Sequence, residues 1–249
     1  LYAPILILIV FSFNESKTLG NWTGFTFDWY ERLLRTSEIT DAIVVTVTLA
    51  VLSSLAATVL GTAAAIGLHA MKKRRRLIIE NISQLPMVNP DLVTGISLML
   101  LFLVIGLRNG YVRLLIAHIT FNLPYVIFSV LPKLRQSSDM LYEAALDLGC
   151  TPLMALWRVV IPDILPGIVS GAILAFTLSI DDFVVSFFAG NGVDNLSMYI
   201  YASARRGVNP ALSTIIFVPV VTLLLIVNIR SIREERRREI QDRKVGLKR

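Results

Sequence analysis

Residues 42 to 70 read Ala42-Ile-Val-Val-Thr-Val-Thr-Leu-Ala-Val-Leu-Ser-Ser-Leu-Ala-Ala-Thr-Val-Leu-Gly-Thr-Ala-Ala-Ala-Ile-Gly-Leu-His-Ala70, and these 29 residues contain no Asp, Glu, Lys or Arg. An α-helix needs about 20 apolar residues to cross a bilayer. A helix of a soluble protein turns one face to water and so rarely lacks charge over such a length. This run therefore predicts a membrane-spanning helix.

The rest of the chain follows the same pattern. Of its 249 residues, 55% are hydrophobic and 17% charged, with a mean hydropathy of +0.67. Soluble domains carry about 25% charged residues. Further uncharged runs cover residues 92–107, 114–132, 164–180 and 211–229. We therefore predict an all-α integral membrane protein with a single transmembrane domain over residues 1–249.

The hydrophobic runs predict six helices. The first ends near Phe13, and the others lie near residues 41–70, 77–107, 111–132, 164–189 and 211–230. The apolar start, Leu1 to Phe13, is too short to span and does not begin with Met, so we expect the native N-terminus to be missing. Pro86 and Pro90 remove backbone donors and should break or kink the third helix.

Basic residues predict the orientation. Loops 71–76, 133–163 and 230–249 hold 17 of the 24 Lys and Arg, whereas loops 14–40, 108–113 and 190–210 hold 7. Basic residues accumulate on cytoplasmic loops. Both termini are therefore expected in the cytoplasm of a bacterial-type cell. The basic run 72–76 is interpreted as a topology anchor, not a nucleic-acid site, and Cys150 alone forms no internal disulfide.

The predicted cytoplasmic loop 133–163 has an unusual sequence. Glu143 and Asp147 lie one turn apart, and Gly149 stands where a short helix would end. Thr151-Pro152 suits the start of a second short helix, which we expect to run to Pro162. Such a helix–turn–helix is a rigid shape that a partner's groove can hold.

This loop resembles the EAA loop of ABC-importer permeases. That family's pattern is Glu-Ala-Ala, three residues, Gly, nine residues, then Ile-x-Leu-Pro, and Glu143, Ala144, Ala145, Gly149 and Pro162 keep its spacing. Positions 159 and 161 depart conservatively. The resemblance implies the fold of a type I ABC-importer permease, with a cytoplasmic coupling helix that docks on an ATPase dimer. The chain lacks a phosphate-binding Gly-x-x-x-x-Gly-Lys-Ser/Thr loop, so ATP and Mg are expected on that partner and no catalytic residue in this chain.

The resemblance extends over most of the chain. Segments 90–93, 119–124, 176–186 and 198–210 are similar to the second permease subunit of spermidine/putrescine importers. That family implies a sister permease and an external polyamine-binding protein, in addition to the ATPase and the surrounding lipid.

Three carboxylates are candidate substrate-path residues. Asp181 and Asp182 interrupt the fifth hydrophobic run, where a carboxylate costs about 2.5–3.5 kcal/mol on insertion scales and needs a partner or a wet path. We favour Asp182 for the path and Asp181 for capping or for pairing with a neighbouring subunit, although the sequence leaves that choice open. Asp91 stands at the expected break of the third helix, where it either faces the cation, caps the next helix, or does both.

Other candidates have two interpretations each. Trp29, in the first external loop, suits either a cation-attracting aromatic face or an interfacial membrane anchor. His69 and His118 are interpreted as packing or polar helix contacts, and no metal site is predicted. Arg205 and Arg206 suit either binding-protein docking or an ordinary solvated loop.

Other functions are weighed against a polyamine permease. A permease for iron, thiamine or another solute shares the loop, and acidic path residues argue against phosphate. A stand-alone channel, a secondary carrier or a membrane scaffold does not need the Glu143–Pro162 spacing. The sequence does not discriminate spermidine from putrescine.

Overall fold

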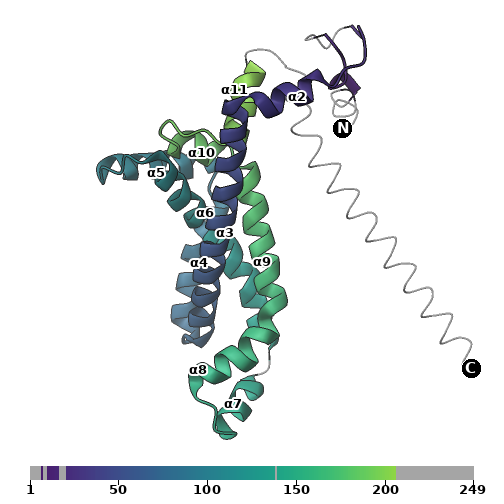
Figure 1. Ribbon diagram of the computed structural model, residues 1–249. Coiled ribbons are helices and arrows are strands. Elements are labelled where there is room, and N and C mark those ends of the chain that lie inside the picture. Colours follow the sequence, from purple (N-terminus) through teal and green to yellow (C-terminus); the bar gives the residue numbers. More distant parts are fainter. Residues whose placement is uncertain (1–6, 8–9, 17–20, 138, 206–249) are drawn as a thin grey trace, which may run out of the picture. The chain divides into compact units, whose positions relative to one another are not determined.

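The computed structural model describes residues 7, 10–16, 21–137 and 139–205 (Figure 1). The regular elements of this part of the chain are helices. The chain divides into two compact units, one made of residues 1–40 with 200–249 and the other of residues 41–199. All-helical architecture was predicted from the sequence, and the structure confirms it.

The described part of the first unit is organised by aromatic side chains. Helix α2 spans Asp28–Arg35. The ring of Phe13 stacks on those of Phe25 and Tyr30, each with centroids 5.4 Å apart. Phe27 lies edge-on to Phe25 at 5.1 Å. Aromatic pairs in these geometries add stability beyond the area they bury, so they help to hold this short loop together although Phe25 and Phe27 are exposed.

Helix α3 spans Ser37–Ala70 without a break, as expected from its uncharged sequence. At about 1.5 Å per residue, its 34 residues are more than long enough for a bilayer core of about 30 Å. The hydroxyl of Thr46 donates to the carbonyl of Ala42 at 2.8 Å. Thr58 donates to Ser54 O at 2.6 Å. These bonds satisfy polar groups inside an apolar helix, which is why it tolerates them in a membrane.

The third predicted helix consists of two helices. Helix α4 spans Lys73–Val88 and α5 spans Asp91–Val104. Their axes meet at 102°. Pro90 supplies an extended residue (φ −57°, ψ 137°) just before α5, whereas Pro86 stays inside α4. The predicted break is thus confirmed at Pro90.

Helix α6 spans Gly110–Gln136 and is the central helix of the second unit. Asn109 caps its start, accepting the Val112 N–H at 3.1 Å. The helix passes through Pro124 and Pro132 without ending. It runs beside α9, as Figure 1 shows.

The segment after α6 begins with α7, Asp139–Asp147. Helix α8 (Pro152–Ala155), a π-helical turn (Leu156–Val160) and α9 (Ile161–Asp181) then follow one another without interruption. The expectation that a short helix ends at Pro162 is therefore wrong. Pro162 lies inside this continuous helical stretch, directly after the π-helical turn, where the wider turn accommodates a residue without an N–H.

The fifth predicted span is also interrupted. Helix α9 ends at Asp181, and α10 restarts over Val184–Ala189. Between them, Asp182 has an extended backbone (φ −62°, ψ 122°). The predicted external loop 190–210 contains another helix, α11, Leu196–Arg205.

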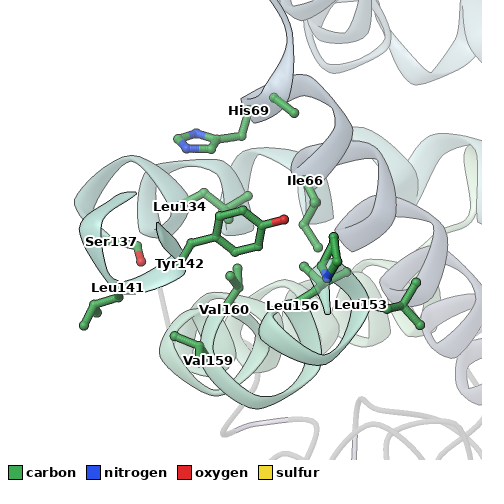
Figure 2. Close-up of a pocket in the computed structure, with 12 residues that line it drawn as sticks. Ile66, His69, Leu134, Ser137, Leu141, Tyr142, Leu153, Leu156, Val159 and Val160 are labelled. Carbon is green, nitrogen blue, oxygen red and sulfur yellow. The ribbon is translucent and has the colours of Figure 1, made fainter. Parts of the chain in front are cut away.

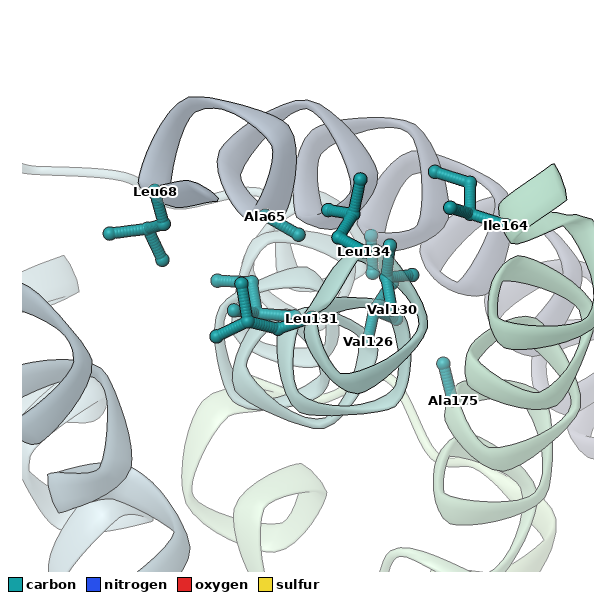
Figure 3. Close-up of a cluster of buried hydrophobic side chains, with 10 residues drawn as sticks. Ala65, Leu68, Val126, Val130, Leu131, Leu134, Ile164 and Ala175 are labelled. Atoms are coloured by element: carbon teal, nitrogen blue, oxygen red, sulfur yellow. The ribbon is translucent and has the colours of Figure 1, made fainter. Parts of the chain in front are cut away.

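Two clusters of buried hydrophobic residues hold the second unit together. One joins α3, α6 and α9 (Figure 3) and contains Ala57, Ala65, Leu68, Val126, Ile127, Val130, Leu131, Leu134, Ile164 and Ala175. The other joins α3, α5, α6 and α10 and contains Leu49, Leu98, Phe102, Leu114, Ala117, Val185 and Ala189. The two clusters thus lie at different levels of α3 and α6, the two helices that they share.

Three described helical segments are long and apolar enough to cross a membrane: residues 37–70, 110–136 and 152–181. The bent pair α4 and α5 adds a fourth candidate. Of the first predicted span, residues 10 and 11 are helical and a turn follows at Phe13. The last predicted span, 211–230, lies outside the described residues.

Candidate functional site

Two helix breaks come together at one end of the second unit. Asp91 is the first residue of α5, directly after the break that follows α4. Helix α10, which follows the break after α9, packs on α5 (Figure 1). Gly95 makes this approach possible, since a Cβ there would lie 3.2 Å from Phe188 Cδ2 and 3.3 Å from Val185 Cα. The two interrupted helices therefore place Asp91 close to Asp181 and Asp182, near enough for its charge to act on both.

Asp182 caps helix α10. Its carboxylate accepts the N–H of Ser186 at 2.8 Å and that of Val185 at 3.3 Å. It also accepts the hydroxyl of Ser186 at 2.7 Å. These bonds satisfy N–H groups that a helix start leaves without partners. The capping role that we had expected of Asp181 is therefore filled by Asp182.

Asp181 and Asp91 are both exposed in this chain. Asp181 is the last residue of α9 and Asp91 the first of α5. Negative side chains are favoured at a helix N-terminus and disfavoured at a C-terminus. Asp181 thus lies at the C-terminal end of α9, where the helix disfavours negative charge. A cation bound beside Asp181 would offset this unfavourable interaction.

His118 lies against this break from α6. It is fully buried. Nδ1 lies 2.6 Å from Ser179 Oγ, and Nε2 lies 2.9 Å from Ser186 Oγ. Both ring nitrogens thus make polar helix contacts, as the sequence predicted. The sequence does not indicate that Ser179 and Ser186 are the partners of His118, because both lie more than 60 residues away along the chain.

Asn195 is a second residue of this site that the sequence did not reveal. Its amide donates to the backbone oxygen of Asp182 at 3.0 Å and to Ser186 Oγ at 2.8 Å. Its Oδ1 accepts the Met198 N–H at 2.9 Å. It is fully buried, so it ties the start of α11 to the break before α10.

Trp29 lies in the other compact unit. Its side chain is 5% exposed, and the indole N–H donates to the backbone oxygen of Asn14 at 2.7 Å. Asn14 is itself buried and accepts the Thr23 N–H at 2.9 Å. Trp29 therefore helps to fix this loop, and its predicted contact with a cation stays a prediction.

The predicted coupling segment forms a compact turn. Gly149 has φ +86°, a conformation that residues with a Cβ rarely adopt. Thr151 Oγ1 accepts the Met154 N–H at 3.4 Å and caps α8. Glu143, Ala144 and Gly149 are exposed, whereas Ala145 is buried, with 7% of its surface exposed. Pro162 lies further along, at the start of α9.

A mainly apolar cavity of about 410 Å³ lies between this segment and the ends of α3 and α6 (Figure 2). Tyr142 and Leu141 border it from α7, and Leu134 from α6. The remaining lining residues are Ile66, His69, Ala70, Ser137, Pro152, Leu153, Leu156, Val159 and Val160. The coupling segment is thus incompletely packed on this side.

An ion pair joins α4 to α6. Glu80 is 7% exposed, and its Oε1 lies 2.7 Å from Arg135 Nη2 and 3.6 Å from Arg76 Nε. We did not predict this pair. The signal was a single Glu in the predicted 77–107 span, since a buried carboxylate requires a partner.

Within the described residues, no group of three or more His, Cys, Asp or Glu side chains is arranged to hold a metal ion.

Comparison with known proteins gives consistent results. Residues 57–232 match the family of binding-protein-dependent transport system inner membrane components. The spermidine/putrescine transport system permease protein PotC of Haemophilus influenzae is 36% identical over 228 residues, covering 91% of this chain and 89% of the relative. The putrescine transport system permease protein PotI of Escherichia coli is 40% identical over 227 residues, covering 87% and 81%.

Solved structures show the same fold. A bacterial ABC transporter that imports the acidic polysaccharide alginate has a chain that matches with a TM-score of 0.69 at 20% identity, over 94% of this chain and 90% of that one. A chain of an amino acid ABC transporter matches with a TM-score of 0.56 at 20% identity, over 85% and 100%. The helices thus follow an ABC-importer permease architecture.

Proposed function

Since the chain belongs to the family of binding-protein-dependent transport system inner membrane components, we propose that it forms half of a translocation path for polyamines, spermidine or putrescine. Relatives that are 36–40% identical carry these substrates in their names. A sister permease forms the other half, and an external polyamine-binding protein delivers the cation. The chain contributes no catalytic chemistry of its own.

The observation that carries this proposal is the meeting of two helix breaks, each with carboxylates. Broken helices inside membranes are tolerated where they line a cavity or are buried in protein. Transporters place substrate and ion sites at such interruptions. A polyamine carries spaced ammonium groups, so separated carboxylates suit it better than a single one.

Asp181 and Asp91 are the carboxylates that we assign to the cation, because both are exposed. Asp182 accepts three hydrogen bonds within its own turn, so its negative charge is already stabilised by the protein. Our sequence-based preference for Asp182 in the path is reversed in this proposal. Asp182 instead keeps the break in shape.

A cytoplasmic ATPase dimer is the proposed partner of the α7–α8 segment. Several large apolar side chains there are exposed in this chain, among them Leu148 at 87%, Leu153 at 70% and Trp157 at 64%. Exposed apolar patches mark interaction surfaces. Glu143 is exposed beside them and supplies a polar contact. ATP and Mg belong to that partner, and both termini of this chain lie on its side of the membrane.

Helix α9 links the two ends of the proposed mechanism. It continues from α8 and ends at Asp181. Closure of the ATPase would displace α7 and α8, and the apolar cavity behind them leaves room for movement. The displacement reaches the break through α9, so Asp181 and Asp91 lose their alignment and the cation leaves inward.

The test uses the complete complex, reconstituted in vesicles with its sister permease, ATPase and binding protein. ATP hydrolysis and uptake are measured while spermidine, putrescine, thiamine and ferric ion are titrated. Stimulation by a polyamine alone supports the proposal, and stimulation by thiamine or iron overturns the substrate while keeping the permease.

Variants then test the carboxylates. Asp181→Asn should lower polyamine uptake per ATP hydrolysed by about tenfold, the effect of losing about 1.4 kcal/mol. Asp41→Asn is the control, because Asp41 is an exposed carboxylate near the start of α3 and lies outside the predicted coupling loop. Equal effects of the two substitutions would contradict the assignment.

A further inference from the structure

A chain of buried hydrogen bonds crosses the second unit. Ser53 Oγ of α3 lies 3.0 Å from Ser179 Oγ of α9. Ser179 Oγ lies 2.6 Å from His118 Nδ1, and His118 Nε2 lies 2.9 Å from Ser186 Oγ of α10. Ser186 then reaches Asp182 Oδ2 at 2.7 Å. Ser53, His118, Ser179 and Ser186 are all 0% exposed, so water does not replace any of these contacts.

The direction of each bond follows from the protons available. Ser186 has one hydroxyl proton, which it donates to the carboxylate of Asp182. It must therefore accept at its contact with His118, and Nε2 is the donor. In a ring with one proton, Nδ1 is then an acceptor, and Ser179 donates to it. Ser53 in turn donates to Ser179 at 3.0 Å, since its other acceptor, the Ala50 carbonyl, lies further away at 3.4 Å.

His118 bridges the break itself. Ser179 lies in α9, before the break, and Ser186 lies in α10, after it. The backbone between them leaves the helical conformation at Asp182. One imidazole, carried by α6, thus holds both sides. Its Nε2 lies 3.6 Å from Asp182 Oδ2, so it reaches the carboxylate through Ser186 and not directly.

We propose that His118 is a positioning residue of the translocation path: it fixes the break between α9 and α10 through Ser179 and Ser186, and so keeps Asp182 as the cap and Asp181 in place for the cation. This inference rests on the proposed function, which assigns Asp181 to the cation. Without the imidazole, Ser179 loses its acceptor and Ser186 loses one of its two donors, keeping only the Asn195 amide. A buried polar group without its partner is costly, so the turn rearranges.

The experiment measures polyamine uptake per ATP hydrolysed by the complete reconstituted complex. His118→Leu should lower this ratio by about tenfold, which corresponds to about 1.4 kcal/mol, while ATP hydrolysis stays within about twofold. His118→Gln retains an amide donor for Ser186 and should recover most of the ratio. Thr120→Val is the control, because its hydroxyl bonds only within α6, to Ile116 O at 2.7 Å.

A double-mutant cycle separates positioning from general packing. If His118 acts through Asp182, adding His118→Leu to Asp182→Asn lowers the ratio no further than Asp182→Asn alone. Fold-changes that multiply would overturn the inference, because independent sites contribute additively in free energy. Should His118→Leu not assemble, Ser179→Ala leaves the imidazole in place, removes the donor to Nδ1 and the acceptor of Ser53, and allows the same cycle.

The two proposals fail in different ways. If Asp181→Asn and Asp91→Asn leave uptake per ATP unchanged, the proposed cation path is wrong. If they lower it while His118→Leu and Ser179→Ala do not, the path stands and the positioning role of His118 is wrong.

Discussion

The contact between α3 and α6 predicts that one substitution has opposite effects at two sites of the same helix. A Cβ on Gly61 would lie 2.8 Å from both Cβ and Cγ1 of Val126, and 3.4 Å from the Leu123 carbonyl oxygen. A Cβ on Gly67 would meet nothing within 4 Å. Both glycines are interior residues of α3, so Gly61→Ala and Gly67→Ala form a matched pair.

The magnitude follows from this geometry. Carbon atoms pack at about 3.5–4.0 Å, so Gly61→Ala requires α3 and α6 to separate by about 0.7 Å or more. Such overpacking costs about 1–3 kcal/mol. Both substitutions gain about 1 kcal/mol of helix propensity. The gain cancels between the two variants, and the difference in unfolding free energy is the overpacking cost alone.

The assay is thermal unfolding of the purified complex in detergent, followed by tryptophan fluorescence. For a chain of this size, about 1 kcal/mol shifts Tm by about 2–4 °C. A cost near the middle of the range then separates the variants by about 4–8 °C, with Gly61→Ala the less stable. If Gly61→Ala unfolded at or above the Tm of Gly67→Ala, the close packing of α3 on α6 would be refuted.

Three further predictions follow. Gly149→Ala should lower ATPase binding in co-purification, because φ +86° costs a side chain about 1–2 kcal/mol; Gly192→Ala carries the same φ of +86° outside the coupling segment and should bind normally. Arg135→Ala should lower the unfolding free energy by about 1.5–3 kcal/mol because Glu80 loses a charged hydrogen bond, and Tm measurement checks it. Uptake in proteoliposomes should fall as external salt rises from about 0.05 to 0.5 M, since salt screens exposed carboxylates; an unchanged rate would contradict a wet acidic path.

The long apolar helix α3 and the turn at Gly149 were predictable because their signals are local. An uncharged run such as residues 42–70 is suited to the lipid bilayer and not to water, and helix α3 includes the whole run. Pro90 has no N–H and a fixed φ, so the break before α5 follows from its own chemistry. A glycine six residues after Glu143 likewise indicates a turn, because the φ of +86° at Gly149 is readily adopted only by glycine.

The division of labour between Asp181 and Asp182 was not predictable, because it depends on one backbone angle. Both are aspartates, and either can cap a helix. Asp182 does so because its ψ of 122° ends α9 and aims the carboxylate at Val185 and Ser186. The sequence was enough to interpret His118 as a polar contact. Its partners could not be identified, because they lie on other helices and a sequence pattern does not report distances between helices.

The close packing of α9 on α6 gives the proposed displacement of the α7–α8 segment a route to the break at Asp182, about 30 Å away, the length of a 21-residue helix. A Cβ on Gly167 would lie 3.0 Å from Ser129 O, and one on Gly171 would lie 3.3 Å from Val126 Cα. Backbones this close leave no side-chain layer to absorb relative motion. Helix α6 leads into the coupling segment and α9 leads out of it. We therefore expect the pair to move as one body and the turn at Asp182, where α9 ends, to take up the movement.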